Sequence, residues 1–211
     1  MQMAREMNTD RTASPDCREG STFRACLAAD LYRYQGRRGI RGFLSAYLWQ
    51  PGFRFTFWLR SAAWLRGRPA CKLLYWIAES RRRKYEIKYG ISIPNDVRIG
   101  SGLYIGHFGG IAVSSDAVIG RYCNISIGVI IGKDVRGSRA GSPEIGDYLY
   151  LAPGAKVIGG IRIGNEVAVG ANCVVTKDID DRSVVVGVPG HVISNKGSRE
   201  YIRWVLGDTR S

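Results

Sequence analysis

Aliphatic residues recur every six positions through the second half of the chain. The recurrence begins at Ile93, slips by two positions between Ile111 and Val113, and resumes after an insertion at 133–144. Its members are Ile93, Ile99, Ile105, Ile111, Val113, Ile119, Ile125, Ile131, Ile145, Leu151, Val157, Ile163, Val169 and Val175. A period of six fits neither an α-helix nor an isolated sheet strand. It predicts a solenoid of very short strands with these residues pointing inward.

A second set of small and apolar residues lies four positions after members of the first. It comprises Val97, Leu103, Gly109, Cys123, Val129, Leu149, Ala155, Ile161, Val167 and Cys173. Gly or Ala commonly follows a residue of the first set, and a small residue lets a backbone turn a corner. We therefore expect both sets to fill the core, with Cys123 and Cys173 among the core residues.

The first ninety residues lack the repeat and hold four of the five tryptophans, all of them within 40–90. Pro51 suits the start of a helix that runs to about Arg66, and a break at 67–69 precedes a second expected helix from Ala70 to Lys84. The first twenty residues contain no apolar stretch typical of a signal peptide and are expected to form a polar tail.

Three segments follow from these patterns. We expect a basic, aromatic-rich helical region with its tail at 1–90, a repeat domain at 91–192 and a C-terminal tail at 193–211. The expected fold class is mainly β, with an α-helical appendage at the N-terminus.

The net charge of +13 is concentrated in the appendage. Residues 1–90 hold 18 Lys and Arg against 7 Asp and Glu, whereas the remainder holds 13 against 11. Two interpretations of residues 40–90 stay open: packing on the solenoid and within an oligomer, or peripheral contact with an anionic membrane. The longest uncharged run there, 43–53, is too short to span a bilayer. Nucleic-acid binding has only the charge in its favour, because no known binding motif is present.

The five cysteines, Cys17, Cys26, Cys71, Cys123 and Cys173, are irregularly spaced. No Cys-x-x-Cys pair and no Cys/His cluster occurs, so the sequence indicates neither a disulfide framework nor a zinc site. We expect free thiols in a cytoplasmic protein, which could lie at the inner face of the membrane.

Three stretches resemble the hexapeptide-repeat acyltransferases, and most closely the serine acetyltransferase-like branch. They are IGSGLYIGHFGGIAVSSDAVIG at 99–120, PEIGDYLYLAPGAKVIGGIRIGNEVAVGANCVVTKDI at 143–179 and VVVGVPGHVI at 184–193. The resemblance implies a left-handed parallel β-helix with about three hexads per coil. It also implies a homotrimer whose active sites lie between adjacent helices and take acetyl-CoA as co-substrate, without a metal.

The chain has two histidines, His107 and His191. The hexad register points His107 outward, and a neutral imidazole can take a proton from an attacking hydroxyl. His107 matches the catalytic base of the family, while a histidine in a trimer contact is the other interpretation. His191 is expected in an exposed closing loop, where contact with CoA is the less favoured interpretation.

The resemblance also implies a path for CoA along small residues. The matching positions are Ala152, Pro153, Gly154, Gly170 and Ala171, with Lys177 near a CoA phosphate or simply in solvent. Small side chains admit a ligand close to the backbone, although the corners of a solenoid need them in any case.

The departures from the family pattern bear on the acceptor. Gly106, Ser92 and the pair Gly141–Ser142 stand where serine acetyltransferases carry charged or imidazole groups. A zwitterion would lose charge-assisted hydrogen bonds there. We therefore expect an O-acetyltransferase acting on a carbohydrate hydroxyl of a surface polysaccharide or glycolipid precursor.

Two alternatives stay open: a serine O-acetyltransferase of cysteine biosynthesis, and a non-catalytic scaffold. Asp96 and Asp116 are both candidates to orient His107, and their spacing does not choose between them.

Overall fold

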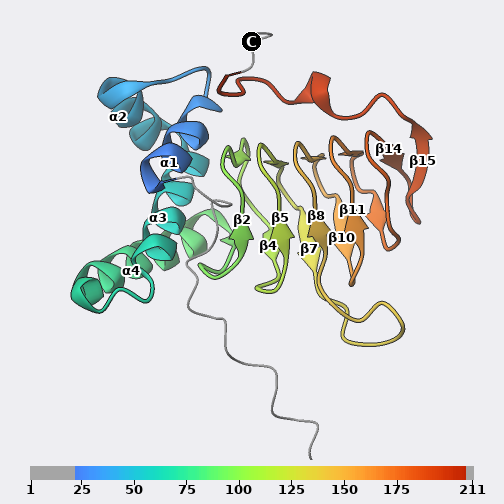
Figure 1. Cartoon of the computed structure of the whole chain (residues 1–211), viewed down its shortest axis with the longest axis horizontal. Helices are drawn as coiled ribbons and strands as arrows, with labels where there is room; N and C mark the ends of the chain where they lie inside the picture. The colour runs from blue at the N-terminus through green and yellow to red at the C-terminus, as the bar shows by residue number, and fades with distance from the viewer. Residues whose placement is uncertain (1–21, 208–211) are drawn as a thin grey trace, which may run out of the picture.

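The computed structural model describes residues 22–207 as a β-solenoid with a helical region packed on its first coil (Figure 1). The helices are α1 (Phe23–Tyr32), α2 (Gly39–Trp49), α3 (Pro51–Leu65) and α4 (Lys72–Tyr89), with short 3₁₀ turns at Pro69–Cys71 and Arg199–Tyr201. The polar tail expected in the first twenty residues lies outside the described part of the chain.

The solenoid has three sheets, and successive strands of each coil enter them in turn. The five-stranded sheet contains β1 (Ile91–Ser92), β4 (Ile111–Val113), β7 (Ile130–Gly132), β10 (Lys156–Ile158) and β13 (Val174–Val175). The four-stranded sheet contains β2 (Arg98–Ile99), β5 (Val118–Ile119), β8 (Glu144–Ile145) and β11 (Arg162–Ile163). The six-stranded sheet contains β3 (Tyr104–Ile105), β6 (Asn124–Ile125), β9 (Tyr150–Leu151), β12 (Ala168–Val169), β14 (Val184–Val186) and β15 (His191–Ser194). All these pairings are parallel except β14 with β15.

The hexad pattern predicted the core. Every residue of the first set is buried, and so is every residue of the second set except Gly109. The strand register explains that exception. Ile105 lies opposite Ile125 and Ala112 opposite Ile130, so the corner between β3 and β4 is two residues longer than the next corner. Ile111 therefore takes the place expected of Gly109, and the slip in the repeat marks a two-residue insertion.

The helical region is more extensive than predicted. Helix α3 agrees with the expectation at Pro51, but α4 continues past Lys84 to Tyr89 and ends at Gly90, whose φ is +61°. Helices α1 and α2 were not predicted. Helix α3 approaches β3 so closely that a Cβ on Gly52 would lie 2.0 Å from the carbonyl oxygen of Ile105. No helix in the described range is long and apolar enough to cross a membrane.

The C-terminal strap, residues 195–207, runs back along the six-stranded sheet to the helices (Figure 1). Tyr201 stacks on Tyr150 with ring centroids 4.7 Å apart, and the ring of Trp204 lies edge-on to Tyr32 at 6.5 Å. The strap therefore joins the last coil to α1.

The prediction that the cysteines form no disulfide is confirmed for some of them and wrong for one. Cys71, Cys123 and Cys173 carry free thiols, and the last two are buried in the core as predicted. Cys26 is disulfide-bonded, so the expectation of free thiols is wrong there. Cys17 lies outside the described residues.

Candidate functional site

The corners that follow the six-stranded sheet stack above one another. The strand register aligns Tyr104 with Asn124, Asn124 with Tyr150, and Tyr150 with Ala168. It follows that residues 106–110, 126–128, 152–154 and 170–172 form one column along the solenoid, which we call the corner column. The residues with positive φ in it are Gly109, Gly110, Gly128, Gly154 and Asn172. A Cβ on Gly128 would lie 3.4 Å from the Cα of Gly154, so adjacent corners lie close together.

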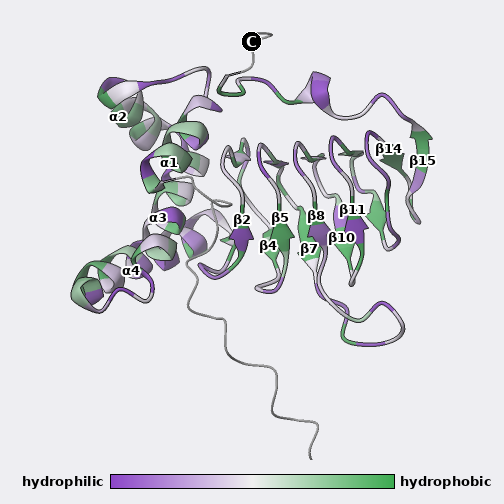
Figure 2. Ribbon diagram, in the orientation of Figure 1, coloured by the Kyte–Doolittle hydropathy of each residue, from purple (hydrophilic) through white to green (hydrophobic). Residues whose placement is uncertain are grey.

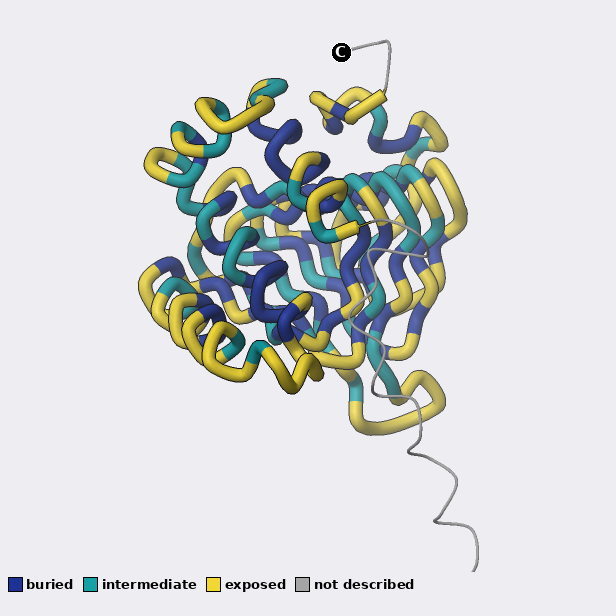
Figure 3. The backbone as a smooth tube through the Cα atoms, turned by 60° about the vertical axis from the view of Figure 1, so that its left-hand side comes forward, coloured by how far each residue is buried: buried dark blue, intermediate teal, exposed yellow. Residues whose placement is uncertain are grey.

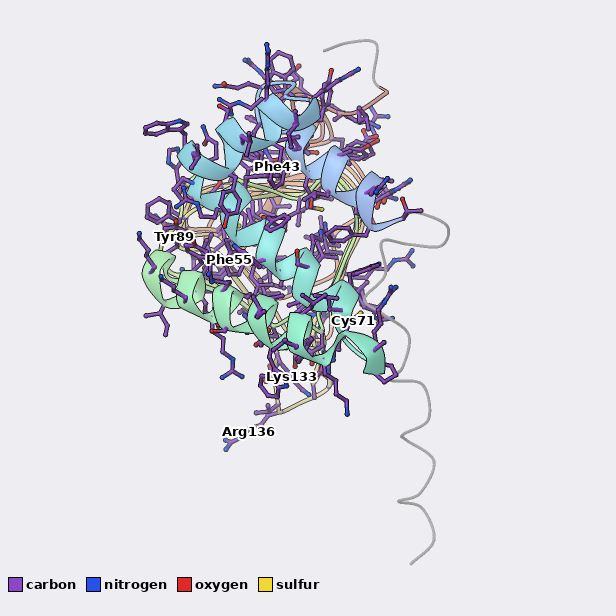
Figure 4. All side chains as sticks on the ribbon, turned by 90° about the vertical axis from the view of Figure 1, so that its left-hand side faces the viewer. Phe43, Phe55, Cys71, Tyr89, Lys133 and Arg136 are labelled. Carbon is purple, nitrogen blue, oxygen red and sulfur yellow. The ribbon has the colours of Figure 1, made fainter. Side chains whose placement is uncertain are left out.

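His107 stands at the head of this column, in the corner that carries the two-residue insertion. Its side chain is exposed, as the hexad register predicted. The ring of Phe108 packs on Tyr89 at 5.1 Å, and a Cβ on Gly106 would lie 2.9 Å from the Tyr104 ring. Figure 4 shows Tyr89 at the end of α4 opposite Cys71. The end of α4 and strand β3 thus hold the loop from which the imidazole projects.

Neither of the two aspartates proposed from the sequence to orient His107 does so within one protomer. Asp96 pairs with Arg66 at 3.5 Å, and Asp116 pairs with Lys133 at 2.8 Å. Asp96 follows β1 and Asp116 follows β4, so both lie past the carboxyl ends of strands in the five-stranded sheet. The His107 loop lies at the amino ends of those strands. Their carboxylates serve other contacts.

The carboxylate of Glu86 contacts Ser92, and the sequence alone did not indicate this contact. The hydroxyl of Ser92 donates a hydrogen bond of 3.0 Å to Oε1 of Glu86, and Arg82 pairs with Oε2 of Glu86 at 2.9 Å. Ser92 lies in β1 opposite Ala112, next to the strand that follows the His107 loop. Helix α4 therefore brings an acidic group to a position that is uncharged in the sequence. The signal available was the spacing of Glu79, Arg82 and Glu86 on one helical face.

Five of the six residues predicted to contact CoA lie in the corner column. Ala152 is buried, Pro153 and Ala171 are exposed, and Gly154 and Gly170 are partly buried. The sixth, Lys177, follows β13 and lies beyond the opposite edge of the five-stranded sheet. The structure therefore does not bring Lys177 together with the other five.

The remaining predicted positions lie outside the four corners of the column. His191 is exposed at the start of β15 and lies opposite Val186, whose Cγ1 is 2.8 Å from the place of a Cβ on Gly170, so it is close to the last corner. Ser142, at the base of the insertion, shares a 2.9 Å hydrogen bond with the hydroxyl of Ser114. The insertion closes on itself through Asp134 and Gly141, and Lys133 and Arg136 lie away from the helices in Figure 4. Among the described residues no group of three or more His, Cys, Asp or Glu side chains could hold a metal ion.

The chain is similar to curated serine acetyltransferases. The chain is 33% identical over 174 residues to a serine acetyltransferase of Synechococcus elongatus, which covers 82% of this chain and 70% of that protein. It is 38% identical over 110 residues to a serine acetyltransferase of Staphylococcus aureus, and spans about half the length of that relative, 52%. No protein-family model matches the chain.

Solved structures agree with the sequence relatives. Serine acetyltransferase from Brucella abortus superposes with a TM-score of 0.68 at 26% identity, over 83% of this chain and 70% of that one. The Neisseria gonorrhoeae serine acetyltransferase in complex with serine gives a TM-score of 0.65 at 28% identity, over 82% and 69%.

Proposed function

The chain belongs to the serine acetyltransferase family, and we propose that it transfers an acetyl group from acetyl-CoA to the hydroxyl of L-serine. The protein is an O-acetyltransferase. The main support for serine as the acceptor is the 33% identity to the Synechococcus enzyme over 70% of its length. The likeness to a serine acetyltransferase structure in complex with serine adds to it.

The prediction of a carbohydrate acceptor is wrong. Relatives at 33–38% identity and the structural neighbours are serine acetyltransferases. The departures at Gly106, Ser92 and Gly141–Ser142 were weighed from the sequence alone. The hydroxyl of Ser92 donates a hydrogen bond to Glu86, so a carboxylate of α4 stands beside a position that is uncharged in the sequence. An uncharged residue at one sequence position therefore does not show that the surrounding structure lacks a charge.

In the proposed mechanism His107 acts as the general base. Its neutral imidazole takes the proton of the serine hydroxyl while the serine oxygen attacks the thioester carbonyl of acetyl-CoA. The tetrahedral intermediate then breaks its carbon–sulfur bond, and the CoA thiolate takes the proton back from the imidazolium. The products are O-acetylserine and CoA. The exposure of His107 beside Gly109 and Gly110, which carry no side chains, supports this role because it leaves room for both substrates.

The corner column supports a path for the pantetheine arm of CoA. Ala152, Pro153 and Gly154 lie one coil before Gly170 and Ala171, on the same edge as His107. We leave Lys177 outside this path because the register places it beyond the other edge of the five-stranded sheet.

The coil is proposed to be left-handed and the assembly a homotrimer. Three strands per coil and parallel pairing agree with the hexapeptide-repeat solenoid, and the structural neighbours share the fold. A flat-sided solenoid suits a closed cyclic oligomer. A trimer of this 23.3 kDa chain has a mass of about 70 kDa, three times that of the protomer.

Peripheral contact with an anionic membrane is proposed for the N-terminal half of α4. Its exposed apolar side chains are Leu73, Leu74, Trp76 and Ile77. Lys72, Arg81 and Lys84 are exposed on the same helix. Figure 2 shows hydrophobic and hydrophilic residues interspersed along α4, and Figure 3 shows its outer side exposed. Apolar groups with nearby cations suit the interface of an anionic bilayer.

An assay of CoA thiol release tests the proposed activity. The wild type is expected to show saturable turnover with acetyl-CoA and L-serine, and His107→Ala is expected to lose about 10²-fold or more in kcat. His191→Ala removes the other imidazole and is expected to cost less than tenfold. Absence of turnover with L-serine, or full activity of His107→Ala, would overturn the proposal.

A further inference from the structure

A cavity outside the proposed active site lies between α1, β3 and the C-terminal strap. Its volume is about 190 Å³. Three arginines, Arg33, Arg37 and Arg203, line it together with the aromatic rings of Tyr104, Tyr201 and Trp204. No acidic side chain is among its lining residues in the described part of the chain. The cavity is therefore strongly basic.

Arg33 is the buried member of this group, with 3% of its surface exposed. Its Nη1 donates to the carbonyl oxygen of Arg203, and its Nη2 donates to Oδ1 of Asn124. Its Nε is buried and has no hydrogen-bond partner within residues 22–207. A buried donor that lacks a partner is rare in folded proteins, because water no longer satisfies it.

Within residues 22–207 no carboxylate accepts a hydrogen bond from Arg33. The carboxylate that acts on it electrostatically, Asp30, is engaged by Arg60 and by the backbone N–H groups of Gly102 and Leu103. Burial lowers the pKa of the Arg33 guanidinium, which is the direction expected for a cation removed from water. Among the described residues, the hydrogen bonds of this buried cation go to neutral acceptors.

An oxyanion in the cavity would supply the negative charge that the buried guanidinium lacks among its hydrogen-bond partners. Guanidinium groups present planar forks of donors that match phosphate and carboxylate oxygens. The guanidinium of Arg37 donates a 3.5 Å hydrogen bond to the carbonyl oxygen of Tyr34, and Arg203, which also lines the cavity, is exposed. The aromatic rings add a surface for an organic body, with the Arg33 guanidinium 5.6 Å from the centre of the Tyr104 ring.

We infer that this cavity binds the oxyanion group, phosphate or carboxylate, of a small metabolite. Arg33 contacts the oxyanion from the buried side, and Arg37 and Arg203 contact it from the surface. The site is separate from the proposed catalytic base, since His107 lies in the corner beyond β3 and not among the lining residues. Binding here does not depend on the proposed serine acetylation.

Titration calorimetry of the full chain with inorganic phosphate, and separately with acetate, tests the inference. Sodium chloride at matched ionic strength is the reference for non-specific screening. Saturable binding of phosphate or of acetate is expected, and the stronger of the two identifies the oxyanion. His107→Ala is expected to bind as the wild type does, which keeps the result independent of catalysis.

Variants locate the binding. Arg33→Met and Arg203→Gln are each expected to raise the dissociation constant at least tenfold. If Arg33→Met does not fold because Arg33 is buried, Arg203→Gln still tests the inference. Arg136→Gln, in the exposed insertion loop, removes a similar charge far from the cavity and is expected to bind normally. The inference is overturned if neither anion binds beyond the chloride reference, or if Arg203→Gln binds as tightly as Arg136→Gln.

Discussion

Two buried charged residues fix the position of the first coil. Asp30 in α1 is fully buried and Arg60 in α3 is 7% exposed, and their side chains pair at 2.9 Å. Arg60 also donates to the carbonyl oxygens of Ile99 and Gly100, each at 2.6 Å. Asp30 accepts from the backbone at Gly102 at 2.7 Å. The pair thus connects two helices to the segment that leads into β3 and on to His107.

Removing one charge of this pair is expected to destabilise the protein severely. Asp30→Asn removes the carboxylate that pairs with the buried Arg60, and breaking a buried ion pair typically costs about 3–5 kcal/mol. Urea unfolding measures the loss. The double variant Asp30→Asn with Arg60→Met removes the uncompensated charge and is expected to be more stable than Asp30→Asn alone.

A matched control is the exposed pair of Asp116 and Lys133, in which both side chains are about half exposed. Asp116→Asn is expected to cost less than about 1 kcal/mol, because surface ion pairs contribute little. Equal losses in Asp30→Asn and Asp116→Asn would show that burial does not set the contribution of the first pair.

At the scale of elements, α4 is held on the solenoid by a compact ionic network. Arg82 pairs with Glu79 at 2.7 Å and donates to the carbonyl oxygen of Ile93 at 3.0 Å. The amide of Asn95 donates to Glu79 at 2.8 Å. Burial raises the pKa of Glu79, but hydrogen bonds from Arg82 and Arg83 outweigh it, and the pKa lies below its ordinary value. Glu79 is therefore more readily ionised in the folded protein than in the unfolded chain.

This pKa shift predicts a pH dependence of stability. A carboxyl whose pKa is lowered on folding stabilises the protein above its unfolded value, near 4.3, and loses that contribution as pH falls through its folded value. Glu79→Gln is expected to be less stable than the wild type at pH 7, with the gap narrowing below about pH 4. Unfolding curves between pH 3 and pH 7 measure the gap. A gap that is constant over this range would contradict the assigned role of Glu79.

The elements that the sequence predicts are those with a strong local pattern. The hexads predicted the core of the solenoid because the inward positions are apolar in almost every coil. The pattern can therefore be read from the sequence without knowing how the coils stack. Helix α3 was predicted from Pro51. Helix α2 begins after Arg38 without a side-chain cap, so no start signal marks it. Helix α4 exceeds its expected end because Tyr89 packs on Phe108, a contact that sequence alone does not show.

The candidate site likewise contains residues that a local sequence pattern indicates and residues that only the tertiary fold brings together. The hexad register predicted that the side chain of His107 is exposed, and the structure agrees. The resemblance to the acyltransferases supplied the small residues of the corner column, five of which lie together, and the roles of all these residues stay a prediction. Glu86 was missed because α4 must fold back on β1 before it meets Ser92. The basic cavity was missed because it joins Arg33 to Arg203, from opposite ends of the chain. Groups that meet only through the tertiary fold leave no local signal.

For the whole molecule, the unequal distribution of charge and apolar surface is the main feature. Residues 1–90 carry most of the excess of +13, and Trp76 on α4 is 67% exposed. A second copy of the chain or an anionic bilayer could cover such a face. Cations near a bilayer contribute about 1 kcal/mol each and are screened by salt, whereas an apolar interface between copies is not. Salt therefore separates the two cases.

The protein is expected to sediment with vesicles that contain phosphatidylglycerol at low ionic strength, and to be released as salt rises. Trp76→Ser is expected to reduce this binding because it removes an apolar anchor. Val135→Ser, which changes an equally exposed residue in the insertion loop, is expected to leave it unchanged. Analytical ultracentrifugation of both variants should still give the mass of about 70 kDa, three times 23.3 kDa. If Trp76→Ser dissociates the oligomer, α4 faces another protomer. If the wild type does not sediment with vesicles, the membrane proposal is wrong.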